Sequence, residues 1–543
     1  MASTIQGALF DPDFNESPRN EIELISTALA LIGSAEGLSA AEQRLLPAIR
    51  QSPRSASVER IAKRIRSGED PLGESFSGLR SAQMRRSRGA TYTPAEIVAA
   101  MMTSAKARGP FDVIIDPGAG SGRFVIEAAR VFPATPLVAI EIDPLAAFIL
   151  RANLAQLAIA ERTQVVVGDY REVELPPRGA GRKLFIGNPP YVRHHDIEPV
   201  WKNWYAAGAK GLGVNASKLA GLHLHFFVRT LQLAQSGDCG IFITAAEWLD
   251  VNYGSALRRL LLDRLGAISI QAIDPKALPF ADAFTTGVIT TFQIGERPEK
   301  ILLQRLHSPT ALRDPSRGAA IAREALTRES RWSTFFRRRP KPPSGSIELG
   351  ELCAVHRGQV TGCNAIWIAG KHSVNLPPRF LMRTVTKARD LLDSDGPLTT
   401  KSQLRTVIDL PVDLEVLDPA AREAVEKFLA WAKRLGAHRN YIAQHRKAWW
   451  AVQLFEPAPI ISTYMARRPP VFVRNLCQAR HLNIAHGLYP REPMSDQLLD
   501  ALSSWLQQNV HLSYGRTYAG GLTKFEPREL ERVPIPRLDN LPL

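Results

Sequence analysis

Three acidic residues in the first half of the sequence directly follow apolar runs. Asp116 follows "DVII", Glu141 follows "PLVAI" and Asp169 follows "TQVVVG". Short apolar runs that alternate with helical segments indicate parallel strands, and ligands lie beyond the carboxyl ends of such strands. An acid about twenty residues beyond a glycine-rich loop accepts hydrogen bonds from ribose hydroxyls. The spacing therefore predicts a binding site for a ligand that contains a nucleoside.

The segment "DPGAGSG" (residues 116–122) lies where the first of these strands turns into a helix. Its alternate glycines let the backbone bend sharply and approach a ligand without Cβ contacts. No Lys-Ser or Lys-Thr pair follows them, which excludes a P-loop, and the leading acid would repel a pyrophosphate but tolerate a cation. A nucleoside that carries positive charge fits better than a dinucleotide, so we expect S-adenosyl-L-methionine as the cofactor.

The elements that must position these residues form a regular pattern from residue 112 onward. Strands are predicted at "DVIIDPG", "PLVAIEID", "TQVVVGD" and "KLFIGNPP", with helical segments such as "GRFVIEAARVF" and "PLAAFILRANLAQL" between the first three. This alternation predicts an α/β fold with a parallel, doubly wound, Rossmann-like sheet.

Three regions are predicted along the chain. Residues 1–80 alternate apolar and polar positions at helical spacing, which predicts a helical N-terminal extension. Its carboxylates in "GEDPLGESF" are interpreted as surface or capping residues, and no catalytic constellation is found there. The α/β domain is expected over residues 81–330, and a basic segment rich in Pro and Ser around residues 330–346 predicts a linker. A second domain without a strand-helix-strand pattern is expected over residues 345–543.

Length, charge and cysteine content narrow the class of protein. A chain of 543 residues is too long for one core, and Lys and Arg exceed Asp and Glu by 68 − 53 = 15. This excess favours a polyanionic partner over an acidic substrate. The four cysteines are scattered without zinc spacing, so no metal is expected, and they suit a reducing cytoplasm. No signal peptide or apolar run of membrane-spanning length is found, so no membrane partner is expected.

Six segments together resemble a known family. They are "RGATYTPAEIVAAMM", "DPGAGSGRF", "EID", "GDY", "GNPPY" and "FADAFTTGVITTF", in this order. They resemble the motifs of gamma-class N6-adenine DNA methyltransferases of the TaqI-like, restriction-modification type, over roughly residues 80–300 and again near the C-terminus. The resemblance implies a methyltransferase catalytic domain and a C-terminal target-recognition domain. It implies sequence-specific methyl transfer from S-adenosylmethionine to the N6 amine of a flipped-out adenine in double-stranded DNA.

The resemblance also assigns residues to the cofactor. Thr93 would help to hold the methionine part, and Asp116 with the loop backbone would line its amino-acid end. Glu141 would take the ribose hydroxyls, while Asp169 would accept from the amino group of the cofactor's adenine with Tyr170 nearby. The complete predicted cofactor set is Thr93, Asp116, Pro117, Gly118, Ala119, Gly120, Gly122, Glu141, Asp169 and Tyr170.

The segment "NPPY" suits transfer to an exocyclic amine. The side-chain oxygen of Asn188 and the backbone carbonyl of Pro189 can accept the two amine hydrogens and stabilise the positive charge that develops. Pro189 and Pro190 make the turn rigid, because proline fixes φ and restricts the residue before it. Tyr191 is predicted to stack on the flipped base, and by resemblance Phe280 packs against it from elsewhere.

The second domain supplies candidate DNA contacts. Four arginines lie near aromatic and amide side chains in "YMARRPPVFVRN" and "QARHLNIAH", and we predict DNA binding for Arg467, Arg468, Arg474 and Arg480. Such side chains bind phosphates or read base edges, and the sequence does not assign which does which.

Several alternatives stay open at this point. The chain is alternatively a bifunctional restriction-modification enzyme, an N4-cytosine methyltransferase or a protein-glutamine methyltransferase. We expect a monomer that acts on DNA in the cytoplasm of a bacterium or archaeon, associated with the nucleoid. A separate cognate restriction endonuclease is a further expected partner.

Overall fold

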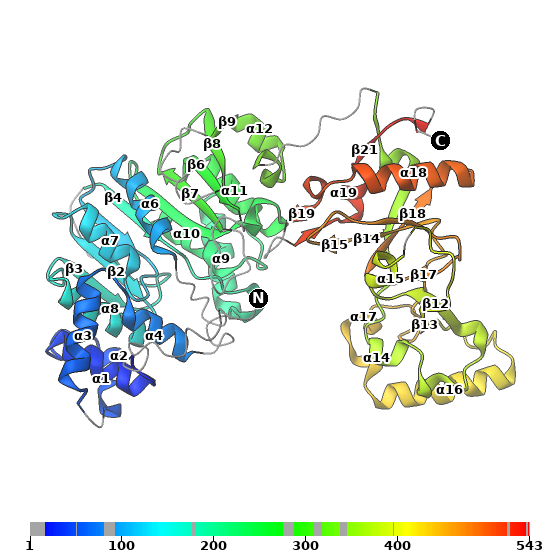
Figure 1. Cartoon of the computed structure of the whole chain (residues 1–543), viewed down its shortest axis with the longest axis horizontal. Coiled ribbons are helices and arrows are strands. Elements are labelled where there is room, and N and C mark those ends of the chain that lie inside the picture. Colours follow the sequence, from blue (N-terminus) through cyan, green and yellow to red (C-terminus); the bar gives the residue numbers. More distant parts are fainter. Residues whose placement is uncertain are drawn as a thin grey trace, which may run out of the picture. The chain divides into compact units, whose positions relative to one another are not determined.

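A computed structural model describes residues 17–49, 52–80, 93–175, 181–274, 287–307, 318–336, 345–394, 396–517, 522–538 and 541. The chain forms two compact units, and the division falls after Phe336 (Figure 1). The first unit includes Trp332, which is buried and donates its indole N–H to the carbonyl of Leu326 at 2.9 Å. The first unit therefore continues past residue 330.

The first unit contains one large sheet, whose strand order is β3-β2-β1-β4-β5-β7-β6-β8-β9. Its strands are β1 (Val113–Asp116), β2 (Leu137–Glu141), β3 (Thr163–Val167), β4 (Lys183–Gly187), β5 (Cys239–Ala245), β6 (Ala267–Ile273), β7 (Gly287–Gln293), β8 (Lys300–Leu306) and β9 (Ala319–Ala322). Strands β3, β2, β1, β4 and β5 are parallel, which confirms the predicted doubly wound α/β fold. The rest of the sheet is mixed, since β7 pairs antiparallel with β5 and β6, and β9 pairs antiparallel with β8.

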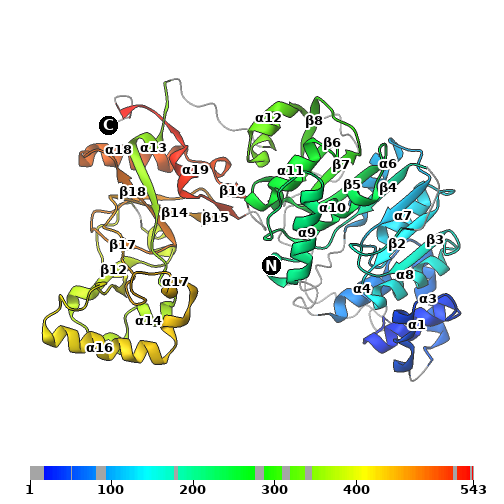
Figure 2. The ribbon, with the colours of Figure 1, turned by 180° about the vertical axis from the view of Figure 1, so that it is seen from behind.

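Helices cover both faces of this sheet, as Figures 1 and 2 show. They are α6 (Ala95–Lys106), α7 (Arg123–Val131), α8 (Pro144–Gln156), α9 (Pro199–Gly211), α10 (Leu222–Leu233), α11 (Ser255–Leu262) and α12 (Arg323–Arg328). Successive strand residues point to opposite faces, so Ile114 packs in the cluster with α6 and α7, while Ile115 packs with α9, α10 and α11. Two apolar layers thus hold the sheet between helices.

The N-terminal segment folds as helices that pack on α8. The elements are α1 (Glu21–Ile32), α2 (Ala40–Gln43), α3 (Ser55–Arg66) and α4 (Pro71–Leu79). Gly33 ends α1 in the left-handed conformation with φ of 82°, and Gly68 follows α3 with φ of 94°. Leu24 and Ile65 are buried in one cluster with Phe148 of α8, so these helices belong to the first unit.

The second unit consists of small sheets and helices. Its strands are β10 (Ile347–Glu348), β11 (Cys353–Arg357), β12 (Leu381–Val385), β13 (Arg405–Ile408), β14 (Ile460–Thr463), β15 (Met465–Ala466), β16 (Phe472–Arg474), β17 (Arg480–His481), β18 (Ala485–Pro490), β19 (Arg516–Thr517), β20 (Thr523–Lys524) and β21 (Pro534–Ile535). Its helices are α13 (Leu349–Leu352), α14 (Asn364–Trp367), α15 (Arg389–Leu392), α16 (Pro419–Arg434), α17 (Tyr441–Gln444), α18 (Asp496–Asn509) and α19 (Pro527–Glu531). The pairs in its four sheets are antiparallel, apart from the parallel pair β12–β17.

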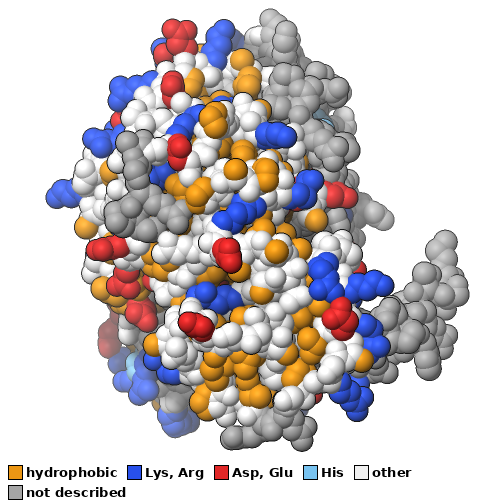
Figure 3. Space-filling view, turned by 90° about the vertical axis from the view of Figure 1, so that its left-hand side faces the viewer, with side chains coloured by type: hydrophobic (Ala, Val, Ile, Leu, Met, Phe, Trp, Pro, Cys, Tyr) orange, Lys and Arg blue, Asp and Glu red, His pale blue; other side chains and the backbone are white. Residues whose placement is uncertain are grey.

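The structure can be compared with the sequence in two further respects, which are membrane-spanning helices and the distribution of charge. Within the described ranges, no helix is both long and apolar enough to span a bilayer. On the face of the first unit in Figure 3, Lys and Arg side chains are scattered among Asp and Glu side chains. The positive excess of the chain is therefore not gathered on that face.

Candidate active site

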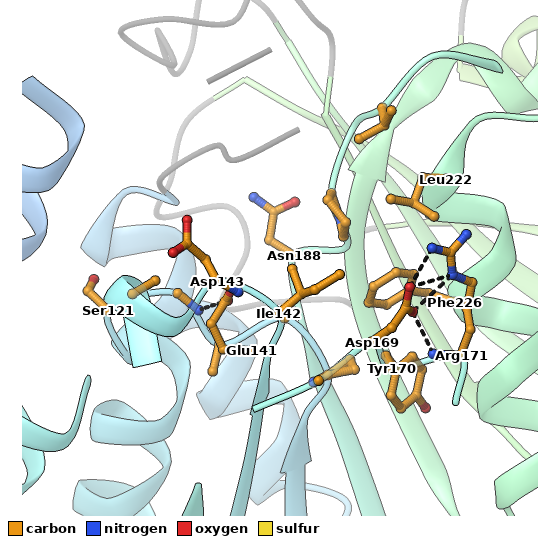
Figure 4. Close-up of a pocket in the computed structure, with 18 of the residues that line it drawn as sticks. Ser121, Glu141, Ile142, Asp143, Asp169, Tyr170, Arg171, Asn188, Leu222 and Phe226 are labelled. Carbon is orange, nitrogen blue, oxygen red and sulfur yellow. Dashed lines mark hydrogen bonds and ion pairs between the residues drawn. The ribbon is translucent and has the colours of Figure 1, made fainter. Parts of the chain in front are cut away.

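A cavity of about 550 Å³ lies beyond the carboxyl ends of β1, β2, β3 and β4 (Figure 4). The predicted residues that line it are Thr93, Pro117, Gly118, Ala119, Gly120, Glu141, Asp169, Tyr170, Asn188 and Pro190. Parallel strands bring these residues together because their carboxyl ends meet at one edge of the sheet. Asp116, Gly122, Pro189 and Tyr191 belong to the same segments but do not line the cavity.

Asp116 lies beneath the glycine-rich loop. It is 1% exposed, and its Oδ1 accepts from the backbone N–H of Gly118 at 3.2 Å. Burial raises the pKa of this carboxyl to about 8, the Gly118 hydrogen bond opposes the rise, and nearby Glu141 adds to it. Gly187 ends β4 beside Asp116, and a Cβ at Gly187 would lie 2.7 Å from Asp116 Oδ1. The glycine of "GNPPY" thus makes room for the buried acid.

Glu141 fastens the glycine-rich loop to the next strand. Its Oε2 accepts from the backbone N–H of Gly120 at 2.7 Å, and its Oε1 accepts from that of Asp143 at 2.9 Å. Gly120 and Gly122 have φ of 53° and 101°, and a Cβ at Gly122 would lie 2.3 Å from Leu150 Cδ1. Burial raises the pKa of Glu141. Glu141, the predicted acceptor for the ribose hydroxyls, therefore also holds the loop in place. The two roles are compatible because each carboxylate oxygen has a further lone pair for a second donor.

Asp169 is paired with an arginine that the sequence analysis missed. Arg171 Nε donates to Asp169 Oδ1 at 2.9 Å, and the Arg171 guanidinium carbon lies 3.8 Å from the ring centroid of Trp201. Tyr170 is buried beside Phe226, with ring centroids 5.1 Å apart, and its hydroxyl is 2.9 Å from Thr230 Oγ1. Asp169 thus presents a carboxylate whose orientation is set by Arg171 (Figure 4).

Asn188 faces the cavity from the end of β4. Its Nδ2 donates to Thr93 Oγ1 at 3.0 Å, which orients the amide. The predicted cofactor residue Thr93 and the predicted catalytic residue Asn188 are therefore in direct contact.

Tyr191 does not line the cavity and packs against a histidine of α10. Its ring meets that of His223 edge-on, with centroids 6.0 Å apart and planes at 86°. Within the described part of the chain, neither the Tyr191 hydroxyl nor the two ring nitrogens of buried His223 have a hydrogen-bond partner. Burial lowers the pKa of His223 to about 3, so its ring is neutral in the folded protein.

Apolar lining residues were also missed. Ile142 is 61% exposed between two acids at the end of β2, and Phe226 and Leu222 come from α10. The sequence did offer a signal for Ile142, which stands between two acids in "EID". An apolar side chain that is exposed at a strand end can contact a ligand. Helix α4 adds Phe76 and Ser77, for which the local sequence offered no signal.

The predicted DNA-binding arginines have different surroundings. Arg467 and Arg468 are exposed. Arg474 is 6% exposed, and its guanidinium donates to Asp500 and, at 2.8 Å, to Asp496. Arg480 is bound by Glu456 at 3.1 Å and by backbone carbonyls. The buried guanidinium of Arg474 is thus held by carboxylates of its own unit, and DNA binding by this residue stays a prediction.

One predicted residue is absent from this description. Phe280, the expected second aromatic against the target base, lies outside the described residues.

The arrangement defines a class of protein. The glycine-rich loop after β1, the acids Glu141 and Asp169 at the ends of β2 and β3, and Asn188 and Pro190 after β4 line one cavity, which also has apolar walls. Carboxylates at the ends of two neighbouring strands beside a glycine-rich loop are suited to a ligand that contains a nucleoside, and S-adenosylmethionine is such a ligand. The first unit is an S-adenosylmethionine-dependent methyltransferase.

Comparison with known proteins gives the family. The family described as "Type II methyltransferase M.Eco57I, C-terminal domain" matches residues 343–542, and "Eco57I restriction-modification methylase" matches residues 182–275. The type II methyltransferase M.XamI of Xanthomonas campestris pv. amaranthicola is 51% identical over 536 residues, which cover 97% of this chain and 99% of that protein. The chain belongs to the type II restriction-modification methyltransferases, and S-adenosylmethionine is its methyl donor.

The chain is also similar to more distant proteins. The type II methyltransferase M.AccI of Acinetobacter calcoaceticus is 21% identical, over 84% of this chain and 87% of that protein. The type IIL restriction-modification enzyme MmeI, solved in complex with DNA, has a TM-score of 0.54 at 12% identity, covering 91% of this chain and 77% of that chain. The similarity to MmeI concerns the fold alone.

Proposed function

We propose that this DNA methyltransferase modifies the N6 amine of adenine in double-stranded DNA at a specific sequence. The observation that carries the proposal is the position of Asn188, which lines the same cavity as Glu141 and Asp169. An amide at the end of β4 beside the methyl donor's site suits an acceptor that is an exocyclic amine rather than a ring carbon.

The chemistry requires help because the adenine amine is a poor nucleophile. The methyl donor supplies an electrophilic methyl group when bound. Asn188 Oδ1 and the Pro189 carbonyl accept the two N6 hydrogens, so positive charge on nitrogen is stabilised as the new N–C bond forms and the S–C bond breaks. Acceptors that are already oriented need little reorganisation in the transition state, and the N6 proton leaves afterward to solvent. The contact with Thr93 keeps the Asn188 amide in that orientation.

The proposal requires the target base to leave the DNA stack. A base inside a duplex is out of reach of such a pocket, and aromatic stacking offsets part of the cost of extrusion. Tyr191 and Phe280 are the proposed stacking residues. Since the Tyr191 ring now meets His223 edge-on, base binding is expected to turn the tyrosine toward the cavity.

DNA binding is assigned to the second unit in this proposal. The exposed pair Arg467 and Arg468 follows β15 and is suited to phosphate contacts. The exposed setting distinguishes this pair from Arg474. We further propose that the enzyme acts as a monomer beside a separate restriction endonuclease. Sedimentation with and without duplex DNA should then show a free species near 59.9 kDa.

The decisive experiment identifies the modified nucleoside. The purified protein is incubated with unmethylated DNA and labelled S-adenosylmethionine, and the DNA is digested to nucleosides. N6-methyladenine is the expected product. N4-methylcytosine in its place would support the cytosine alternative, while unlabelled DNA would contradict the proposal. Sequencing of the modified DNA would also supply the recognition site.

A further inference from the structure

The carboxylate of Asp70 joins the N-terminal helices to the glycine-rich loop. Its Oδ2 accepts from Ser121 Oγ at 2.6 Å and from Arg123 Nε at 3.1 Å. Its Oδ1 accepts from the backbone N–H of Gly73 at 3.0 Å, which caps α4, and from Asn153 Nδ2 at 3.3 Å. Asp70 is thus more than the capping residue that its sequence suggests.

Ser121 and Arg123, which both donate to Asp70, are the residues directly before and after Gly122, whose φ is 101°. Ser121 is 3% exposed, and Arg123 begins α7 directly after Gly122. Both side chains donate to one carboxylate oxygen, which fixes the chain where the loop becomes a helix. A carboxylate at a helix N-terminus is also favourable because the exposed N–H groups there carry partial positive charge. The contacts therefore restrain the part of the loop that approaches the cofactor.

The same contacts continue to the proposed catalytic amide. Arg123 Nη1 donates to the Thr93 carbonyl at 3.2 Å, and Thr93 Oγ1 accepts from Asn188 Nδ2 at 3.0 Å. A chain of side-chain contacts therefore runs from α4 to the end of β4.

Helix α4 also forms part of the cavity wall. Phe76, Ser77 and Arg80 line the cavity. Arg80 is ion-paired with Asp143, which follows Glu141 and Ile142, and its Nε lies 3.3 Å from Glu21. The N-terminal segment thus contacts both the glycine-rich loop and the segment after β2.

We propose that Asp70 is a positioning residue that holds the glycine-rich loop in the conformation that binds S-adenosylmethionine, so the N-terminal helices are part of the cofactor site. This inference rests on the cofactor site proposed above. Asp70 acts through Ser121 and Arg123 and is not itself assigned to the chemistry.

The test compares three conservative variants of the full chain. In Asp70→Asn, the side-chain oxygen can still accept from the backbone N–H of Gly73 and cap α4. The NH₂ group then takes the place of Oδ2 and cannot accept from Ser121 and Arg123. Glu42→Gln weakens a different attachment of the same helices, the 2.7 Å ion pair to Arg151 of α8. Asp418→Asn is the matched control, since Asp418 also caps a helix that begins with proline and also pairs with an arginine, in the second unit.

Cofactor affinity is measured by titration calorimetry with S-adenosylmethionine, alongside thermal unfolding. Asp70→Asn should raise the dissociation constant at least tenfold and raise the KM for the cofactor without changing the KM for DNA. Glu42→Gln and Asp418→Asn should stay within twofold of the wild type. Ser121→Ala should change affinity in the same direction as Asp70→Asn, by a smaller factor.

Two outcomes would overturn the inference. Wild-type affinity in Asp70→Asn would show that the loop does not depend on this carboxylate. An equal loss of affinity in Glu42→Gln would show that general packing of the helices is responsible. Failure of the wild-type protein to bind S-adenosylmethionine would instead remove the cofactor site on which the inference rests, so the two failures are distinguishable.

Discussion

Charged side chains have different surroundings in the two units of the chain. In the first unit, Glu141 and Asp169 follow neighbouring parallel strands and line one cavity. In the second unit, Arg474 and Arg480 bind carboxylates and carbonyls of the same unit. In the first unit, parallel strands direct their ends to one edge of a sheet and collect polar groups there. In the second unit, Arg474 of β16 and Arg480 of β17 lie in short strands and hold neighbouring segments together. A charged residue at the end of a strand is thus a stronger indicator of a ligand site in the first unit than a charged residue of a strand in the second unit.

The largest expected effect tests the cavity of the first unit. Asn188→Ala should lower the rate of methyl transfer about a thousandfold, because it removes one of the two acceptors for the amine hydrogens. Cofactor affinity should remain within about threefold. Single-turnover transfer and titration calorimetry measure the two quantities.

Asn509→Ala, which removes an amide at the end of α18, is the control and should transfer at the wild-type rate. Rapid transfer by Asn188→Ala would remove the catalytic role from the amide.

The next effect tests whether Arg474 is structural. Arg474→Met should lower the free energy of unfolding by about 2 kcal/mol, because it removes charge-assisted hydrogen bonds from a buried guanidinium. The expected loss is no larger because the side chains of Asp496 and Asp500 are 88% and 60% exposed, so solvent screens their attraction to the guanidinium. Urea denaturation measures the change. A loss of DNA affinity at unchanged stability would instead place Arg474 in the DNA interface.

A pH dependence should follow from the buried acid of the first unit. The pKa of Asp116 is raised to about 8, so the folded carboxyl is protonated below that pH. The role predicted for Asp116, at the amino-acid end of the cofactor, requires the ionised form. The dissociation constant for S-adenosylmethionine should therefore rise as pH falls below about 8, by up to about tenfold per pH unit.

Titration calorimetry between about pH 6.5 and about pH 8.5 measures the dissociation constant over a range that spans the Asp116 pKa of about 8. Asp116→Asn is the reference, since it removes the carboxyl while the cofactor's own titration stays the same. Parallel pH profiles for the two proteins would rule out control by Asp116.

The smallest effect concerns the exposed arginines of the second unit. Replacing Arg467 and Arg468 by alanine should weaken DNA binding about threefold each at moderate salt and lower the slope of log affinity against log salt by about two. Stability should not change, because both side chains are exposed. Fluorescence anisotropy over a range of KCl concentrations measures the slope. An unchanged slope would mean that the two arginines make no phosphate contacts.

Much of the first unit follows from local patterns. The strands that precede the side chains of Asp116, Glu141 and Asp169 are recognisable because short apolar runs rich in β-branched residues and bounded by turn residues favour strands over the longer helices. The glycine-rich loop is recognisable because few other residues tolerate its backbone angles. The motif after β4 adds the candidate chemistry. These features lie within short windows, so a reading of the chain alone can locate them.

Other features of the site could not be predicted. The pairing of Asp169 with Arg171 uses neighbours in sequence, but an arginine two residues from an acid is usually solvated. The edge-on contact of Tyr191 with His223 depends on how α10 packs beside β4. The burial of Arg474 likewise depends on α18, which lies beyond it in the chain.

The sequence by itself determined the order of strands, glycine loop, acids and Asn-Pro-Pro-Tyr, and with that order the class of chemistry. Tertiary structure decided which side chains support them. Asp70 and Ser121 are 51 residues apart in the chain, and their 2.6 Å contact arises only because α4 packs on α8, with its cap residue beside the glycine-rich loop and the start of α7. Local patterns specify elements because backbone geometry is periodic, whereas contacts of this kind depend on packing that no short window of sequence contains.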